Sequence, residues 1–147
     1  MSRTCYIHLV YSTKLREPCI TDDVRESLHR YQAAVLQNLG CPPVLINSVE
    51  DHTHALFELA RTVTIAAAVE EVKSSSSKWI KSQGPEFASF AWQAGYGAFS
   101  VSRSNLHQVR RYVESQREHH RCVTFQDEFR EFLRRHGIGF DERHVWD

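Results

Sequence analysis

The chain has 147 residues with 18 basic and 18 acidic side chains, so its formal net charge is zero when histidine is neutral. Its length is typical of one domain, and 41% hydrophobic and 24% charged residues exclude bulk disorder. A mean hydropathy of −0.45, without any apolar run of about 18 residues, excludes a membrane-spanning helix. We therefore expect one globular domain over residues 1–147.

The N-terminal segment and the cysteines indicate a cellular compartment. The apolar stretch near the N-terminus is too short for a signal peptide and lacks a small-residue cleavage site. The cysteines stand far apart without a C-x-x-C pair, at Cys5, Cys19, Cys41 and Cys122. This spacing is typical of reduced thiols in the cytoplasm rather than of a disulfide framework or a cysteine zinc site.

The first half of the chain predicts three strands and one helix. Residues 5–13 are rich in β-branched and aromatic side chains and predict a strand. Asp23 followed by Glu26 predicts the start of a helix, by analogy with a capping box, and Gly40 ends it. After Pro42 and Pro43, two further strands are predicted with a turn at Glu50 and Asp51 between them, over residues 44–49 and 53–59.

The second half predicts more helix than strand. Apolar positions recur near a period of 3.6 over residues 65–81, which predicts a helix that ends before Gly84 and Pro85. Residues 90–101 predict a strand pair or a bent strand. Ser104 or Asn105 caps a third helix to about residue 120, and a fourth runs from Thr124 to Gly137. The order β-α-β-β-α-β-α-α predicts an α+β fold of ferredoxin-like, split-βαβ type, with helices packed on an antiparallel sheet.

The zero net charge is an average over unlike segments. Residues 1–60 carry five basic and seven acidic side chains, residues 61–111 carry seven and three, and residues 112–147 carry six and eight. Such a chain is not an indiscriminately basic coat for nucleic acid, but its basic middle permits a local groove for a DNA strand. The alternative is that these cations lie on solvated helix faces.

Two histidines stand at the start of the third predicted strand, in the sequence Asp51-His52-Thr53-His54. Side chains alternate along a strand, so His52 and His54 share a face and can converge on one ion. Imidazole binds divalent transition metals and tolerates harder ions when oxygens complete the shell, and Asp51 could orient one of the rings. The alternative is two exposed histidines, and a metal site requires a further ligand from elsewhere.

A tyrosine and a glutamine stand one turn apart in the third predicted helix. Tyr112 and Gln116 are i and i+4 and border an apolar stripe, so both lie at the seam between helix and sheet. The Gln116 carbonyl could complete a metal shell begun by the histidines. Tyr112 could then attack a group held there, because a phenol with a pKa of about 10 needs a nearby cation or base to become a nucleophile. The alternative is a packing tyrosine beside a solvated glutamine.

Several extended motifs occur in one order along nearly the whole chain: the opening strand running into STKLR at 12–16, DHTH at 51–54, KSSSSKW at 73–79, WQAGYGAFSV at 92–101, YVESQREHH at 112–120 and TFQDEF at 124–129. In this combination the chain resembles the single-tyrosine transposases of the HUH nuclease superfamily. More narrowly, it resembles the small TnpA-like insertion-sequence transposases and their relatives associated with repetitive extragenic palindromes.

The resemblance implies a site and a reaction. His52 and His54 would ligate Mg²⁺ or Mn²⁺ with Gln116 as the third ligand, and Tyr112 would be the nucleophile. Its attack on single-stranded DNA would leave a 5′-phosphotyrosine and a free 3′-hydroxyl, which later rejoins strands. The resemblance also implies DNA hairpins as partners, and a homodimer in which the tyrosine helix of one subunit often completes the site of its partner. It further implies no nucleotide cofactor, no membrane and a cytoplasmic protein that associates with the nucleoid.

One position departs from the family pattern. The residue between the two histidines is usually bulky and apolar, whereas this chain has Thr53. We expect its side chain to point away from the metal, so that ligation survives. Candidate contacts to DNA phosphates are basic side chains in or near the motifs, namely Lys14, Arg16, Lys73, Lys78, Lys81 and Arg103.

Three other hypotheses remain open at the level of sequence. The first is a domesticated relative that nicks chromosomal palindromes, or a replication or conjugation initiator. The second is a non-catalytic DNA-binding module of the same fold. The third is a zinc hydrolase, which would require a third His, Asp or Glu near His52 and His54 that the sequence spacing does not supply.

Overall fold

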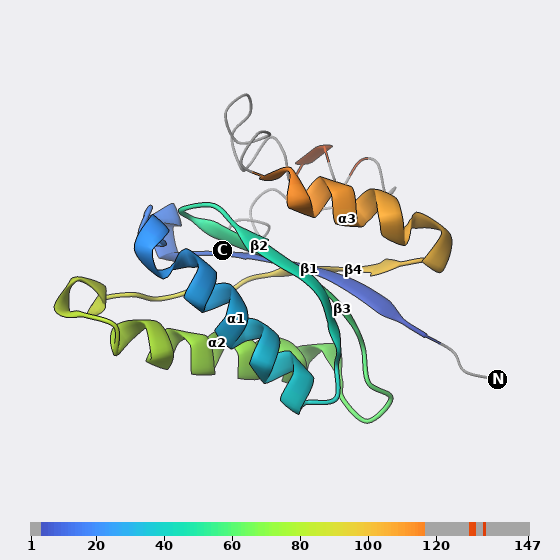
Figure 1. The fold of residues 1–147 in the computed structure, drawn as a ribbon, viewed down its shortest axis with the longest axis horizontal. Helices are drawn as coiled ribbons and strands as arrows, with labels where there is room; N and C mark the ends of the chain where they lie inside the picture. Colours follow the sequence, from blue (N-terminus) through green and yellow to red (C-terminus); the bar gives the residue numbers. More distant parts are fainter. Residues whose placement is uncertain (1–3, 117–129, 132–133, 135–147) are drawn as a thin grey trace.

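The computed structural model describes residues 4–116, 130–131 and 134, and within them helices cover both faces of a four-stranded sheet (Figure 1). Short 3₁₀ turns at Lys14–Arg16, Pro85–Phe87 and Arg103–Asn105 lie between the longer elements. In chain order these are β1 (Tyr6–Ser12), α1 (Asp22–Asn38), β2 (Pro43–Ser48), β3 (His52–Glu58), α2 (Ile65–Lys81), β4 (Gly97–Val101) and α3 (Leu106–Glu114).

The strand order in the sheet is β2-β3-β1-β4, and each neighbouring pair is antiparallel. β2 and β3 form a hairpin whose turn contains Glu50 and Asp51, as predicted. β1 lies in the middle of the sheet, between β3 and β4. This order is that of the split-βαβ, ferredoxin-like fold, so the predicted α+β class is confirmed.

The two faces of the sheet bury different sets of side chains. α1 and α2 lie on one face, and α3 lies on the other (Figure 1). Ala55 and Phe57 of β3 belong to the core under α1 and α2, whereas Leu56 packs with Val109 and Val113 of α3. Because side chains alternate along a strand, residues 52 and 54 face α3 as Leu56 does, and residue 53 faces the other way.

The predicted bounds of the two long helices are nearly those observed. α2 spans Ile65–Lys81 as predicted, and the Thr64 hydroxyl caps it by accepting a hydrogen bond from the Ala67 amide at 3.1 Å. α1 begins one residue earlier than predicted, with Thr21 at the N-cap. The Thr21 hydroxyl bonds to the Asp23 carboxylate instead of to a backbone amide, so Asp23 lies in the first turn and does not open the helix.

The strand prediction for residues 90–101 is correct only at its end. β4 spans Gly97–Val101, and the preceding residues make a single isolated bridge, between Thr13 and Trp92. The ammonium of Lys73 on α2 binds the carbonyl oxygens of Gln93, Ala94 and Gly95. These carbonyls are satisfied by a side chain rather than by a neighbouring strand, which is why the strand does not begin earlier.

The start of the third helix is as predicted in position. A 3₁₀ turn over Arg103–Asn105 precedes α3, and Asn105 is the N-cap residue, although its side chain makes no capping hydrogen bond. The Ser104 hydroxyl bonds to that of Ser102 at 3.1 Å. Of the predicted fourth helix, the structure describes residues 130, 131 and 134, which are helical, and the remainder lies outside the described residues. None of the described helices has both the length and the apolar character needed to cross a bilayer.

Candidate active site

The two histidines of the DHTH motif lie at the beginning of β3, beneath α3. Their rings are buried, with 0% of His52 and 2% of His54 exposed. The ring centroids are 5.1 Å apart and the rings are inclined by 70°. The alternation of β3 therefore brings both imidazoles to one face, as predicted, and the alternative of two exposed histidines is excluded.

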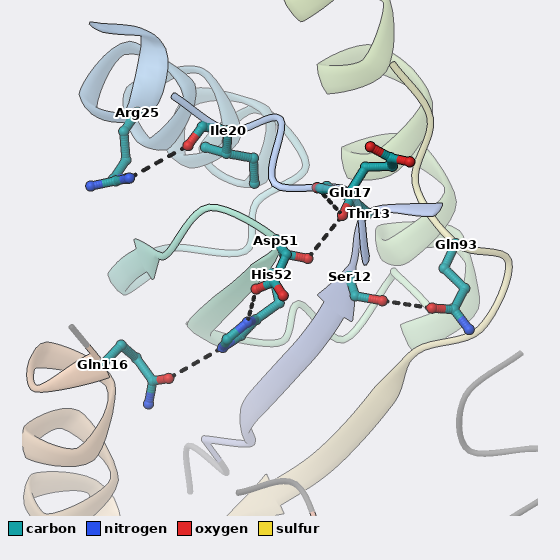
Figure 2. A network of polar contacts seen from close by, with 9 residues as sticks. All are labelled: Ser12, Thr13, Glu17, Ile20, Arg25, Asp51, His52, Gln93 and Gln116. Atoms are coloured by element: carbon teal, nitrogen blue, oxygen red, sulfur yellow. Dashed lines mark hydrogen bonds and ion pairs between the residues drawn. The ribbon is translucent and has the colours of Figure 1, made fainter. Parts of the chain in front are cut away.

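Gln116 reaches the same point from the end of α3. Its Oε1 lies 3.4 Å from His52 Nε2, and the side chain is completely buried. Its Nε2 donates to the backbone carbonyl of Tyr112 at 3.1 Å. This hydrogen bond uses the amide nitrogen and turns the amide oxygen toward His52 (Figure 2). Gln116 and His52, 64 residues apart in the chain, are thus brought together as predicted.

Asp51 holds the other side of the His52 ring. The carboxylate Oδ1 lies 2.8 Å from His52 Nδ1 (Figure 2). A carboxylate only accepts hydrogen bonds, so Nδ1 carries a proton and donates to it. The predicted orienting contact of Asp51 is therefore present in the structure, and it leaves Nε2 as the ring nitrogen that faces Gln116.

A third histidine, His8 on β1, belongs to the site and was missed by the analysis of the sequence. Its Nε2 lies 2.9 Å from His54 Nδ1, and the two rings stack with centroids 5.1 Å apart and an inclination of 23°. His8 is completely buried. It lies in the opening strand, 46 residues from His54 in the chain, where no spacing marks it as a site residue, so only the pairing of β1 with β3 reveals it. The strand register could have located His8, because it pairs Val10 with His54 and His8 with Leu56, which faces α3 as the two histidines do.

Tyr112 packs against these rings from α3. Its ring is half-buried and meets His54 edge-on at 5.7 Å and His8 edge-on at 6.1 Å between centroids. Tyr112 stands one turn before Gln116, so the same helix presents both side chains to the histidines. The four residues predicted to form the site, His52, His54, Tyr112 and Gln116, are therefore adjacent in the folded chain.

The donor atoms fit a hard divalent ion. Among the described residues, no group of three or more His, Cys, Asp or Glu side chains could hold a metal, so a site here must use the Gln116 amide oxygen. Two ligand atoms each about 2.1 Å from an octahedral ion lie about 3 Å apart. The separation of 3.4 Å between His52 Nε2 and Gln116 Oε1 is close to that value. The zinc hydrolase hypothesis required a third His, Asp or Glu near His52 and His54. His8 is a third histidine beside His54, but the described residues form no group of three or more such side chains that could hold a metal, so the hypothesis gains no support.

The candidate DNA contacts are spread over the molecule. Lys14 and Arg16 are exposed in the turn after β1, which is tied to the site because the Thr13 amide donates to the Asp51 carbonyl at 2.8 Å. Lys78 and Lys81 are exposed on α2, on the opposite face of the sheet from the histidines. Arg103 is exposed before α3, at the other end of that helix from Gln116.

Lys73 differs from the other candidate DNA contacts. Its ammonium binds three backbone carbonyls, and burial lowers its pKa. In this conformation its three donors hold residues 93–95 in place. A contact between Lys73 and DNA phosphate stays a prediction, as do those of the other five basic residues.

Comparisons with known proteins indicate a family. A family model described as IS200-like transposase matches residues 1–116. The ISDra2 transposase TnpA of Deinococcus radiodurans is 22% identical over 116 residues, which are 76% of this chain and 83% of the relative.

Two solved structures have a similar fold. One is described as a candidate transposase from Deinococcus radiodurans R1, with a TM-score of 0.63, 22% identity, and 79% of this chain and 93% of that chain covered. The other is a REP-associated tyrosine transposase bound to a REP hairpin, with a TM-score of 0.61, 12% identity, and 84% and 72% covered. At these identities the two structures establish the fold, and the family model extends over most of the sequence. The chain therefore belongs to the IS200-like transposase family.

Proposed function

We propose that this transposase cleaves and rejoins single-stranded DNA at hairpin-flanked sites through a 5′-phosphotyrosine on Tyr112. In this proposal His52, His54 and Gln116 hold Mg²⁺ or Mn²⁺, and the working unit is a homodimer. The observation that carries the proposal is the convergence of four side chains from β3 and α3 on one buried point, with Gln116 Oε1 3.4 Å from His52 Nε2 and Tyr112 edge-on to His54.

The chemistry follows from what each side chain can do. The Tyr112 oxygen attacks the phosphorus of a phosphodiester, a tyrosine O–P bond forms, and the bond from phosphorus to the 3′-oxygen breaks. The leaving oxygen takes up a proton and becomes a 3′-hydroxyl. A bound divalent ion would polarise the phosphate and favour the phenolate of Tyr112.

Rejoining is the reverse exchange. A 3′-hydroxyl attacks the phosphotyrosine, a new phosphodiester forms and Tyr112 leaves as a phenol. Each step exchanges one ester bond for another, so the energy of the phosphodiester is retained and no nucleotide cofactor is required.

DNA hairpins are proposed as the substrate because a structural relative was solved with a REP hairpin bound. On this chain, the exposed turn with Lys14 and Arg16 supports the proposal, since it is hydrogen-bonded to the residue before His52. Phosphate contacts by such cations give affinity without reading sequence, so hairpin binding and cleavage are separable measurements.

The test uses a labelled hairpin oligonucleotide that carries the DNA flanking the gene. With Mn²⁺ present, the wild-type protein should form a covalent protein–DNA adduct and Tyr112→Phe should form none. His52→Ala should lose cleavage while its binding of the hairpin changes only a few-fold. An adduct formed by Tyr112→Phe would show that another residue is the nucleophile. Hairpin binding that is unaffected by EDTA, without nicking at any divalent ion, would favour a non-catalytic module instead.

A further inference from the structure

A buried histidine on the central strand is directed at one of the proposed metal ligands rather than at substrate. We propose that His8 is a positioning residue, which fixes the His54 ring in the tautomer that can bind a divalent ion through Nε2. This inference rests on the proposed function, because it assigns a partner to one of the two metal-ligating histidines.

The contact is specific in its atoms. His8 Nε2 and His54 Nδ1 are 2.9 Å apart, within the range of a hydrogen bond between ring nitrogens, and no part of His8 is exposed. The rings are nearly parallel, with an inclination of 23°. Phe99 belongs to β4, which pairs with β1 on the side away from β3, and its ring centroid lies 6.3 Å from that of His8. His8 is therefore confined by neighbours on both sides.

The tautomers follow from the chemistry of imidazole. A ring that ligates through Nε2 must have its lone pair there, so a neutral ring carries its proton on Nδ1. For His54, that proton points at His8 Nε2, which must therefore accept it, and His8 must carry its own proton on Nδ1. His8 Nε2 thereby supplies the acceptor that the buried Nδ1–H of His54 needs in the ligating tautomer.

The same arrangement is present at the neighbouring ligand. Asp51 Oδ1 accepts from His52 Nδ1 at 2.8 Å, and in the proposed tautomer His8 Nε2 accepts from His54 Nδ1 across 2.9 Å. Each ring therefore has an acceptor behind its Nδ1 and presents its Nε2. The two acceptors differ in kind, since one is a charged carboxylate in the turn before β3 and the other a neutral ring on the paired strand.

The test compares two substitutions that separate packing from hydrogen bonding. His8→Phe keeps a flat ring against His54 but removes the acceptor, whereas His8→Gln keeps an acceptor oxygen on a flexible side chain. We measure Mn²⁺ affinity of the full-length protein without DNA, by the electron paramagnetic resonance signal of free Mn²⁺. In His8→Phe we expect the Mn²⁺ affinity to be about 10- to 100-fold weaker, as is typical when the hydrogen-bond partner of a metal ligand is removed. His8→Gln should stay within a few-fold of wild type.

A second readout does not depend on metal. In the metal-free protein, ¹⁵N chemical shifts of the imidazoles should show His54 protonated on Nδ1 in wild type and in His8→Gln. In His8→Phe the proton should redistribute to Nε2. Circular dichroism verifies that each variant is folded. If His8→Phe does not fold, His8→Lys replaces it, because a lysine can only donate hydrogen bonds. Comparing wild type, His8→Gln and His8→Lys then separates packing from hydrogen-bond acceptance in the same way.

The outcomes distinguish this inference from the proposed function. Equal Mn²⁺ affinity of His8→Phe and wild type, or an unchanged His54 tautomer in His8→Phe, overturns the positioning role. A weakened affinity without any change in the His54 tautomer also overturns it, because His8 would then be a ligand itself. Wild-type protein that forms no Tyr112 adduct overturns the proposed function, and the two metal-binding readouts are made without DNA and are independent of that result.

Discussion

Thr53 stands between the two histidines but belongs to the opposite face of the sheet. Its side chain is completely buried, and its hydroxyl has no hydrogen-bond partner among the residues that the structure describes. The departure from the bulky apolar residue usual in the family therefore adds a polar atom to the α1 and α2 side and leaves the rings of His52 and His54 in place. Its consequence is a loss of stability rather than of metal ligation, because a buried hydroxyl without a partner costs about 1–3 kcal/mol.

We predict that Thr53→Val raises the free energy of unfolding by about 1 kcal/mol, since it replaces the hydroxyl by a methyl group of similar size. Thr13 is the matched control. It is equally buried, but its hydroxyl donates to the Glu17 carbonyl at 2.7 Å, so Thr13→Val should lower the same free energy by about 1 kcal/mol or more. Urea unfolding of both variants measures the two changes. Equal destabilisation by the two substitutions would show that the Thr53 hydroxyl is satisfied in solution.

At the scale of elements, the position of α3 depends on β2 as well as on the core. The last carbonyls of a helix have no partner within it. Asn47 of β2 supplies one, because its Nδ2 donates to the carbonyl oxygens of Val113 at 2.8 Å and Glu114 at 3.3 Å. Asn47 is also the pairing partner of His54 across the hairpin. One side chain thus ties the end of α3, where Gln116 follows, to the strand pair that carries the histidines.

We predict that Asn47→Ala lowers the rate of adduct formation about 10- to 100-fold, because small displacements of a nucleophile have effects of this size. Stability should fall by only about 1 kcal/mol, and hairpin affinity should change little. The rate of adduct formation at saturating hairpin, with urea unfolding in parallel, separates these effects. Asn38→Ala, at the exposed end of α1, should leave the rate unchanged. A rate for Asn47→Ala equal to that of Asn38→Ala would contradict the anchoring role.

The parts of the fold that the sequence predicted well depend on local patterns. α2 was predicted because a regular apolar period is followed by a Gly-Pro pair. Strand alternation paired His52 with His54, and helical spacing paired Tyr112 with Gln116, while the resemblance to the transposases assigned all four to one site.

What the sequence did not predict depends on contacts between distant segments. The segment before β4 is shaped by Lys73, about twenty residues earlier on α2, and no period in the sequence reports such a contact. His8 is similar, because its place beside His54 follows from the register of β1 against β3 and not from any motif. Residue spacing predicts which side chains of one helix or strand share a face. Contacts between side chains of different strands depend on the strand order and register of the sheet.

At the scale of the whole molecule, the described chain contains a complete set of proposed catalytic groups. α3 follows β4 through a connection of a few residues and packs on its own sheet, with Val109 and Val113 against Leu56. Gln116 and Tyr112 therefore meet the histidines of the same chain. The resemblance to transposases that work as dimers left open whether the tyrosine acts in its own subunit or in its partner. The packing of α3 favours its own subunit.

We predict that two inactive variants do not complement each other. Tyr112→Phe lacks the nucleophile and His52→Ala lacks a metal ligand, so in the observed arrangement each chain of a mixed dimer has an incomplete site. The two purified variants are unfolded together, refolded and assayed for the covalent adduct on the labelled hairpin, with co-refolded wild-type protein as the control for recovery. About half of randomly mixed dimers are heterodimers, and each of these would have one complete site of two if the Tyr112 of one subunit served the histidines of the other. Adduct formation at about a quarter of the wild-type level or more would therefore show that the tyrosine acts in the partner subunit. No adduct above background, with wild-type activity recovered, is the result that the packing of α3 on its own sheet predicts.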